Sequence, residues 1–219
     1  MKISIIIAAF ALFPSFAKAQ DLCPDSHHPH VIDLGLPSGT KWACCNVGSS
    51  KPEGYGSYFA WGEAFNDNYF NLDNYVWYNR DKLTKYNTVA LLGAVDNRTQ
   101  LELSDDAAHR NWHGAWRMPT IAEMTELIDN CSYTWTTIKR VKGGLFTSRS
   151  NGCSIFLPAS GWCNGLLLNG RGEFGYYWSS SLFESDPDFA HYLLFRPSGT
   201  DTNANNRYVG RNVRPVLRN

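Results

Sequence analysis

After residue 30 the chain is a succession of short apolar runs interrupted by clusters of glycine and proline. Short runs rich in aromatic and β-branched side chains, bounded by turn-forming residues, are typical of β-strands. The runs with this pattern are Thr40–Ala43, Tyr58–Trp61, Gly144–Thr147 and Ser154–Leu157. The pattern predicts a domain in which short, mostly antiparallel strands supply most of the regular structure.

One stretch has the periodicity of an amphipathic helix. Thr120 and Glu123 match a capping box, in which the threonine side chain accepts from the third backbone amide and the glutamate reaches back to the cap. The apolar residues that follow recur at helical spacing and so share one face, and they are Ile121, Met124, Leu127 and Ile128. The sequence therefore predicts a helix that begins at this box and packs this face on the core.

A second, shorter helix is predicted over Leu103–Trp112. Ser104 is a suitable N-cap, and Asp105 and Asp106 would lie in the first turn, where the helix dipole favours negative charge. Residues 64–90 show no clear period and are interpreted as a long ordered excursion. With two helices among many short strands, the predicted class is α+β.

The N-terminus has the organisation of a secretory signal peptide over residues 1–19. Ile3–Phe13 is an apolar run too short to span a bilayer, and Ala17–Ala19 offers the small-x-small site that signal peptidase recognises. Cys23 lacks the small residue expected before a lipidated cysteine. We therefore expect cleavage before Gln20 and a secreted or cell-surface protein without a lipid anchor.

The rest of the chain divides into a polar leader, residues 20–30, and a single domain, residues 31–219. The 20 Lys and Arg residues balance the 20 Asp and Glu residues, so the basic excess typical of nucleic-acid binders is absent. No later apolar stretch reaches transmembrane length, and no membrane insertion is expected after cleavage. The aromatic fraction of 14% is high, and tyrosine and tryptophan favour interfaces as well as cores.

Cysteine usage points to disulfides. An even number of cysteines in an exported chain favours structural bridges, although spacing alone leaves many connectivities open. A zinc site is the alternative, but no C-x-x-C spacing occurs. The residues expected to form disulfides are Cys23, Cys44, Cys45, Cys131, Cys153 and Cys163.

Two polar clusters have the chemistry of metal ligands. Ser26–His30 carries several imidazoles, and Glu184, Asp186 and Asp188 are closely spaced carboxylates that could suit calcium. The first cluster lies in the leader, and the second lacks the twelve-residue calcium-loop pattern and contains Pro187. We interpret both as solvated segments and expect no metal and no cofactor.

Catalytic motifs are missing from the chain. It has no G-x-S-x-G and no H-E-x-x-H, and its G-x-G-x-x-G at Gly170–Gly175 runs into a predicted strand instead of the helix that a dinucleotide site needs. Carboxylates that could form the pair of a glycosidase are Glu63, Asp105, Glu123 and Glu173, and nothing in the sequence singles out two of them. The sequence therefore favours a protein that is not an enzyme.

A family resemblance rests on motifs that follow one another in order from Val31 to Val216. They are VIDLGLPSGTKWA (31–43), CNVG (45–48), YFAWGE (58–63), DDAA (105–108), WRMPT (116–120), SIFLPA (154–159), YYWSSS (176–181) and VRPV (213–216). Together they resemble the Fibrobacter succinogenes major paralogous domain, a family of exported proteins of gut Bacteroidetes. The resemblance implies a C-type-lectin-like fold close to that of formylglycine-generating enzymes.

Two departures limit what the resemblance implies about activity. The catalytic cysteine pair of formylglycine-generating enzymes has no counterpart near this C-terminus. The Glu-Pro-Asn, Gln-Pro-Asp and Trp-Asn-Asp signatures of calcium-dependent sugar binding are also missing. Neither formylglycine formation nor calcium-mediated sugar binding is therefore expected.

The resemblance also suggests roles for cysteines and tryptophans. Cys45 and Cys131 fall where the family tends to have cysteine, which implies a Cys45–Cys131 disulfide. Cys153 and Cys163 are close in sequence, which suggests a local Cys153–Cys163 bridge. The third pair is then Cys23–Cys44. The tryptophans inside the motifs are assigned to the core, and they are Trp42, Trp61, Trp116 and Trp178.

Between the last two motifs the chain is rich in side chains that hydrogen-bond well but make poor core material. The residues expected to contact a ligand are Phe183, Glu184, Asp186, Asp188, His191, Arg196, Asp201, Asn203, Asn205, Asn206, Arg207 and Tyr208. Related lectin-like proteins include targets of diversity-generating retroelements, which vary at Asn-rich positions just ahead of the closing segment. The cluster 203–208 is similar in placement, and an ordinary polar loop is the alternative.

The leading hypothesis is a secreted or cell-surface, non-catalytic binding module that recognises a glycan or a protein through this polar surface. Aromatic side chains would stack on the ligand, while Asn, Asp and Arg would fix its orientation. The alternatives are a glycan-active enzyme with unidentified carboxylates and a structural subunit of a surface assembly. Carboxylates in a deep cleft would favour the enzyme, and an exposed apolar patch would favour the subunit.

Overall fold

The structure is a computed structural model that describes residues 30–65 and 68–217. The predicted signal peptide, Cys23 and all of the predicted leader except His30 lie outside the described residues. The helices are α1 (Ala107–Trp112) and α2 (Ile121–Asn130), with a 3-10 turn η1 (Ala90–Leu92). The strands are β1 (Val31–Ile32), β2 (Lys41–Ala43), β3 (Tyr78–Asn79), β4 (Lys82–Leu83), β5 (Cys131–Ile138), β6 (Val141–Ser148), β7 (Ser154–Pro158), β8 (Trp162–Asn164), β9 (Leu167–Asn169), β10 (Gly175–Leu182), β11 (Phe189–Arg196), β12 (Gly199–Asn206) and β13 (Val216–Leu217).

These strands form three three-stranded sheets, β10–β11–β12, β5–β6–β7 and β1–β2–β13, and two hairpins, β3–β4 and β8–β9. Every pairing between the named strands is antiparallel. Two α-helices among many short antiparallel strands confirm the predicted α+β class in the described part of the chain. Neither of these helices is long and apolar enough to cross a membrane.

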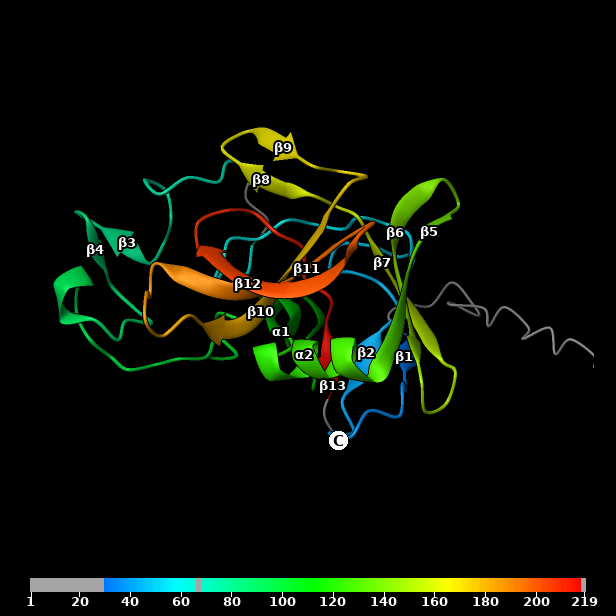
Figure 1. The fold of residues 1–219 in the computed structure, drawn as a ribbon. Coiled ribbons are helices and arrows are strands. Elements are labelled where there is room, and N and C mark those ends of the chain that lie inside the picture. The colour runs from blue at the N-terminus through cyan, green and yellow to red at the C-terminus, as the bar shows by residue number, and fades with distance from the viewer. Residues whose placement is uncertain (1–29, 66–67, 218–219) are drawn as a thin grey trace, which may run out of the picture.

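The β10–β11–β12 sheet is central, and α2 lies against one of its faces (Figure 1). Leu193 and Phe195 of β11 are fully buried there against Met124 and Leu127 of α2, and Phe146 of β6 closes the same core. Complete burial of a side chain of this size contributes about 1.5–3 kcal/mol. The predicted apolar face of α2 therefore anchors the helix to the sheet.

The other face of the sheet carries a second core built around two buried tryptophans, Trp61 and Trp178. The Trp61 Nε1–H donates to the Ser179 carbonyl at 2.8 Å, and the Trp178 Nε1–H donates to the Phe59 carbonyl at 2.9 Å. A buried indole needs such a partner because its N–H would otherwise be left without a hydrogen bond. These bonds fix the segment around residue 60 against the sheet.

The two ends of the described chain meet in the β1–β2–β13 sheet. Val31 of β1 pairs with Ala43, and Val216 of β13 pairs with Trp42 on the other side of β2. Arg214, just before β13, is fully buried. The closing VRPV motif is therefore part of the core that joins the two ends.

α2 begins where the capping box predicts. The Thr120 hydroxyl oxygen accepts from the Glu123 N–H at 3.2 Å, and the Glu123 carboxylate accepts from the Thr120 N–H at 2.8 Å. The same carboxylate accepts from the Arg117 guanidinium at 2.5 and 2.8 Å and from the Thr40 hydroxyl at 2.8 Å. One capping residue thus joins the start of α2 to the segment before β2.

α1 is shorter than the predicted helix, and its N-cap is Asp106 instead of Ser104. The Asp106 carboxylate accepts from the His109 N–H at 2.9 Å and from the Met118 N–H at 2.8 Å. A carboxylate has two acceptor oxygens, so it can cap the helix and also bind an amide of the segment that leads to α2. The single hydroxyl of Ser104 is less suited to both tasks.

Three of the four predicted strand runs lie in β2, β6 and β7. The prediction of a strand over Tyr58–Trp61 is wrong, because this run forms a single isolated bridge, between Phe59 and Arg211. Its other backbone contact with the same partner segment is the Trp61 N–H donating to the Arg207 carbonyl at 2.8 Å. The side chains of this run are mostly buried, but its backbone forms too few hydrogen bonds with the segment after β12 to make a strand.

The predicted core tryptophans are buried with one exception. Trp42, Trp61 and Trp178 are fully buried, but the assignment of Trp116 to the core is wrong, because its side chain is partly exposed. Trp116 lies in the turn between α1 and α2 and packs edge-on against Trp112, with ring centroids 5.3 Å apart. Its motif supplies the cap of α2 without placing this indole in the core.

The disulfides implied by the resemblance at Cys131 and Cys163 do not form, because both residues carry free thiols. The pairings that are wrong are Cys45–Cys131 and Cys153–Cys163. Burial raises the pKa of each of these two thiols to about 11. A raised pKa keeps the thiol protonated and unreactive at neutral pH.

The geometry of the second pair explains the error. Cys153 packs against the core under the central sheet, whereas Cys163 in β8 packs in a separate cluster with Phe70 and Tyr75. Strand β7 runs between the two cysteines, so their closeness in sequence does not bring them together. The third implied pair, Cys23–Cys44, includes a residue outside the described part.

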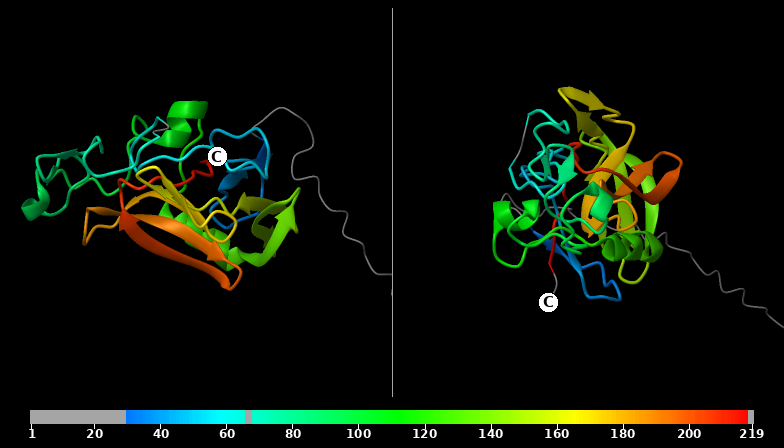
Figure 2. Two further views of the ribbon diagram at one scale, coloured as in Figure 1. Left: turned by 90° about the horizontal axis from the view of Figure 1, so that it is seen from above. Right: turned by 90° about the vertical axis from the view of Figure 1, so that its left-hand side faces the viewer.

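The segment from residue 68 to the end of η1 projects from one end of the molecule, opposite the β5–β6 hairpin (Figure 2). It contains only β3, β4 and η1 as regular structure, with turns between them. We call residues 68–92 the projecting segment. Two hollows are lined in part by this segment where it meets the body of the domain.

Candidate functional site

The residues predicted to contact a ligand lie on β11, β12 and the loops at their ends, and the structure does not gather them in one place. A hollow of about 360 Å³ is lined in part by Phe183, Glu184 and His191. A second, of about 160 Å³, is lined in part by Asp188, Asn206, Arg207 and Tyr208. A third, of about 100 Å³ at the β11–β12 turn, is lined in part by Arg196 and Asp201. The predicted residues that line none of these three are Asp186, Asn203 and Asn205.

Arg207 lines the second hollow but is only 1% exposed, and its guanidinium is engaged within the domain. Its Nε–H donates to the Tyr75 hydroxyl at 2.9 Å, and its two terminal nitrogens donate to the carbonyls of Lys85, Tyr86 and Pro187 at 2.8–3.1 Å. These acceptors belong to the projecting segment and to the loop before β11. Arg207 therefore fastens the projecting segment to the end of β12.

The polar side chains of β12 protect an exposed sheet edge. In the β11–β12 register the amides of Thr202, Ala204 and Asn206 face away from β11. Each donates to the side-chain oxygen of the residue before it, at 2.7–2.8 Å, and those residues are Asp201, Asn203 and Asn205. Because an open edge invites pairing with another strand, this arrangement gives these residues a structural role in addition to any contact with a ligand.

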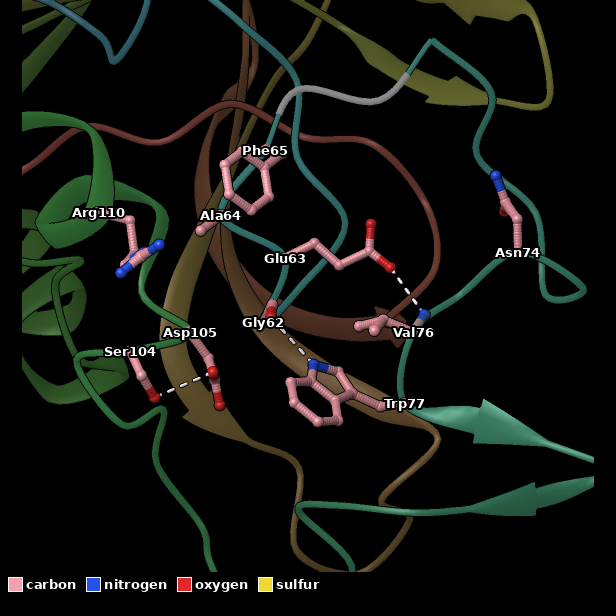
Figure 3. Close-up of a pocket in the computed structure, with 10 residues that line it drawn as sticks. All are labelled: Gly62, Glu63, Ala64, Phe65, Asn74, Val76, Trp77, Ser104, Asp105 and Arg110. Carbon is pink, nitrogen blue, oxygen red and sulfur yellow. Dashed lines mark hydrogen bonds between the residues drawn. The ribbon is translucent and has the colours of Figure 1, made fainter.

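A pocket of about 360 Å³ lies between the projecting segment and α1, and we call it the Trp77 pocket (Figure 3). The residues that line it are Gly62, Glu63, Ala64, Phe65, Asn74, Val76, Trp77, Ser104, Asp105 and Arg110. Trp77 and the strongly exposed Phe65 and Val76 supply apolar walls. Carboxylate, amide, hydroxyl and guanidinium groups complete the lining.

Local geometry holds the indole of Trp77 in place. Its Nε1–H donates to the Gly62 carbonyl at 3.0 Å, and its ring meets Tyr86 edge-on with centroids 5.9 Å apart. Gly62 has a φ of 80°, and a Cβ at this position would lie 2.7 Å from the Trp77 Nε1 atom. Glycine is therefore required here both by the backbone conformation and by the closeness of the indole.

A compact charge network lies beside the indole. The Lys85 ammonium contacts the carboxylates of Asp105 and Glu102 at 2.5 Å each and lies 4.9 Å from the centroid of the Trp77 ring. Burial would lower the pKa of Lys85, but its hydrogen bonds to the two carboxylates outweigh burial and raise it. The Tyr86 hydroxyl also donates to Asp105 at 2.5 Å, and burial together with this bond raises the pKa of Tyr86. Asp105 thus enters the pocket as part of a preorganised network.

Arg110 supplies a cation without a partner among the described residues. It lies in the last turn of α1, and its guanidinium turns toward the pocket (Figure 3). No hydrogen bond or ion pair joins this guanidinium to another residue in ranges 30–65 and 68–217. A guanidinium offers five N–H donors in a planar fork, which suits hydroxyl and carboxylate oxygens of a ligand.

Two of the four carboxylates considered for glycoside hydrolysis, Glu63 and Asp105, line this pocket together. Glu63 accepts from the Val76 N–H at 2.9 Å, and Asp105 is held by the network described above. Glu123 caps α2, and Glu173 is exposed on the glycine turn between β9 and β10. The pocket was not predicted as a whole, because its lining comes from three segments that the sequence treats separately.

The hollow at His191 has a different character. The ring of His191 meets Phe183 edge-on with centroids 5.3 Å apart, and Glu184 and Gln100 lie on its rim. Burial lowers the pKa of His191, which favours the neutral imidazole. This hollow brings three predicted residues together in a mainly polar setting.

No cluster of three or more His, Cys, Asp or Glu side chains in the described part of the chain could hold a metal ion. His109 and His113 have H-x-x-x-H spacing at the end of α1. A ring nitrogen of His109, however, lies 3.2 Å from the Trp116 carbonyl and is engaged there.

Comparison of the chain with models of known protein families finds no match, and comparisons with curated proteins and with solved structures find none either.

Proposed function

We propose that the protein is a secreted or cell-surface, non-catalytic binding module that holds a glycan in the Trp77 pocket. One observation carries this proposal. Apolar walls from Trp77, Phe65 and Val76 face hydrogen-bonding groups that include the unpaired guanidinium of Arg110. A sugar ring has one apolar face and a periphery of hydroxyls, so it complements such a lining.

The size of the pocket agrees with this class of ligand. Its volume of about 360 Å³ lies at the lower end of the range of about 300–1,000 Å³ typical of small-molecule sites. Phe65, which lines the pocket, is strongly exposed, so a longer saccharide could continue past its ring. We therefore expect recognition of one or two residues of a larger saccharide.

The state of the carboxylates supports binding over hydrolysis. A glycosidase needs one carboxylic acid that can give up a proton and a second carboxylate placed across the scissile bond. Asp105 is instead held by Lys85 and Tyr86, and Glu63 accepts from a backbone amide. Both groups can accept hydrogen bonds from sugar hydroxyls without taking part in proton transfer.

The C-type-lectin-like character of the fold is part of the same proposal. The motifs of the Fibrobacter succinogenes major paralogous domain family supply buried parts of this domain, including Trp42, Trp61 and Trp178, and the cap of α2. Such a frame supports irregular segments that carry the ligand-binding residues. The observed α+β arrangement is compatible with this resemblance.

The proposal is tested by comparing the binding of the parent protein and of the Trp77→Ala and Arg110→Gln variants to a glycan array. Each variant is expected to weaken binding of the best ligand about tenfold or more, because each removes one half of the complementary lining. Arg140→Gln, an exposed arginine in the β5–β6 turn, is the matched control and should bind as the parent does. Addition of a chelator should leave binding unchanged.

Two results would count against this assignment. Release of reducing sugar from a bound glycan, lost in Glu63→Gln, would show an enzyme. Retention of full affinity in Arg110→Gln would place the glycan elsewhere, and since Arg110 is exposed and unpaired, this variant is expected to fold normally.

A second candidate function, a subunit of a surface assembly built from copies of this chain, is favoured by one exposed apolar patch. Leu166 and Leu167 at the β8–β9 turn are 78% and 70% exposed, and Tyr69 beside them is 46% exposed. The projecting segment meets this turn through the Phe70–Gly165 bridge, and the Tyr69 ring lies close to Gly165, directly before the two leucines. Contiguous exposed apolar side chains often mark interaction sites.

Sedimentation velocity measures whether this patch joins copies of the chain. The parent protein is expected to shift to a larger species as concentration rises, and Leu166→Ser with Leu167→Ser should remain a monomer. A monomer at all concentrations for both proteins would remove this candidate.

A further inference from the structure

A second hollow, separate from the Trp77 pocket, lies between the projecting segment and the end of β12. Its volume is about 160 Å³. The residues that line it are Leu72, Tyr75, Tyr78, Leu83, Asp188, Asn206, Arg207 and Tyr208. We call it the tyrosine hollow, because three of its walls are phenol rings. Asp188, Asn206 and Tyr208 are residues that the sequence had marked for ligand contact.

The carboxylate of Asp188 is the unusual group in this hollow. It is half-buried, yet no N–H or O–H of the described residues donates to its oxygens. Its own backbone N–H donates to the neighbouring Asp186 carboxylate at 3.3 Å, so a second negative charge lies close by. Burial and this neighbour raise the pKa of Asp188 and outweigh the charge of Arg207, which lowers it. A half-buried carboxylate of this kind is stabilised by a cation that approaches from the open side.

Arg207 balances the charge of Asp188 only in part. Its Nε–H and both terminal nitrogens are used by the Tyr75 hydroxyl and by three backbone carbonyls. No salt bridge joins it to Asp188 within the described part of the chain. For the same reason Arg207 is poorly placed to bind an anion, which the carboxylate of Asp188 would also repel.

The remaining walls suit a cation with an apolar surface. Tyr78 and Tyr208 are partly exposed, and Tyr75 is buried beneath them. The faces of aromatic rings attract ammonium groups, and such rings with a carboxylate are the usual surroundings of alkylated ammonium ligands. Leu72 and Leu83 add aliphatic contact for methyl or methylene groups.

We propose that the tyrosine hollow binds a small alkylammonium group, such as the trimethylammonium head of choline. Asp188 supplies the opposite charge, and Tyr78 and Tyr208 supply aromatic walls. The hollow is smaller than a typical site for a whole small molecule, so it accommodates a head group while the rest of the ligand lies outside. This site is independent of the glycan site, because the two share no lining residue.

Titration calorimetry of the full chain with choline and with 3,3-dimethyl-1-butanol tests the proposal. The two probes have nearly the same shape, but only choline carries a positive charge. Choline is expected to bind, and the neutral analogue is expected to bind at least about tenfold more weakly. Equal affinity for the two probes, or no binding of choline, would overturn the proposal.

Variants locate the site. Asp188→Asn should weaken choline binding about tenfold or more while leaving the melting temperature unchanged or higher, because it removes a half-buried charge without a partner. Asp201→Asn, an exposed carboxylate on β12, is the matched control and should bind choline as the parent does. Unchanged choline affinity in Asp188→Asn would refute the site. Arg110→Gln should keep choline binding even if no glycan is found, which separates this proposal from the first one.

Discussion

Replacing Arg214 with methionine is expected to lower the free energy of unfolding by about 3–5 kcal/mol. Arg214 is fully buried and donates to Asn46 Oδ1 at 2.8 Å and to the Phe156 carbonyl at 2.9 Å. It also donates to the carbonyls of Ala43 and Cys44, at 3.2 Å each. Methionine fills a similar volume, but it leaves all four acceptors without this donor.

The size of the effect follows from the cost of an unsatisfied buried acceptor, about 1–3 kcal/mol each. Removal of a buried cation returns part of this cost, since the charge no longer has to be desolvated. The acceptors lie on β7, at the end of β2 and on the segment after it, so the loss reaches the sheet that joins the two ends of the described chain. Urea denaturation followed by tryptophan fluorescence measures the change.

Two further variants make this test specific. Arg214→Lys keeps the charge but cannot reproduce the fork of donors, so its loss of stability should lie between those of the parent and the methionine variant. Arg140→Met changes an exposed arginine and should stay within about 0.5 kcal/mol of the parent. If Arg214→Met unfolds at the same urea concentration as the parent, the hydrogen bonds of Arg214 do not stabilise the fold.

The burial of individual arginines could not be predicted from the sequence. Arg196, Arg207 and Arg214 are chemically alike, yet the first is exposed and the other two are buried. What separates them is the set of carbonyls around each side chain, and most of those carbonyls come from segments more than a hundred residues away, such as Tyr86 for Arg207. Composition marks Arg207 as polar and so predicts ligand contact, whereas the VRPV motif places Arg214 in the framework. Only the tertiary arrangement shows that both guanidinium groups hold buried segments together.

Local signals were reliable where a few neighbouring residues decide the structure. The capping box at Thr120 and Glu123 predicts the start of α2, because both partners of the motif lie within one helical turn. The glycine turn before β10 is predicted in the same way, and Gly170 and Gly172 have φ of 65° and 80°. The class of the fold follows from such local elements.

The Trp77 pocket has no comparable signal. Gly62, Trp77 and Arg110 belong to three segments whose meeting depends on the whole fold, and the projecting segment lacks the periodicity that predicts a helix or strand. Trp77 stands outside every motif used to assign the core, and its partial exposure is the feature that the sequence could not provide. The tyrosine hollow was predicted in part, because Asp188, Asn206 and Tyr208 lie within the polar stretch that the sequence marks.

Acidification is expected to lower the free energy of unfolding strongly, because it protonates Glu123. Burial alone would raise the pKa of this carboxyl, but hydrogen bonds from Arg117, from the Thr120 N–H and from the Thr40 hydroxyl outweigh burial and hold the pKa at about 2. In the unfolded chain the pKa is near the ordinary value of 4.5. Because the folded pKa is the lower one, the ionised form stabilises the native state above about pH 4.5, and this stabilisation is lost as the pH falls toward 2.

The pKa difference corresponds to about 3 kcal/mol, at about 1.4 kcal/mol for each pKa unit. Glu123→Gln should therefore lower the free energy of unfolding by about this amount at pH 7, since the ion pair with Arg117 is lost and a partly buried guanidinium is left without this partner. Between pH 5 and pH 2 the difference between the parent and the variant should shrink steadily, as the parent loses the same stabilisation by protonation.

Urea unfolding curves of both proteins at several pH values measure this difference. The comparison isolates Glu123, because the contributions of the other carboxylates, such as Asp96 with its lowered pKa and Asp106 with its raised pKa, occur in both proteins. Glu173→Gln, which changes an exposed carboxylate on the glycine turn, should follow the parent at every pH. A constant gap between the parent and Glu123→Gln from pH 5 to pH 2 would mean that the cap does not titrate with folding, and that Arg117 and Thr40 stabilise α2 by other contacts.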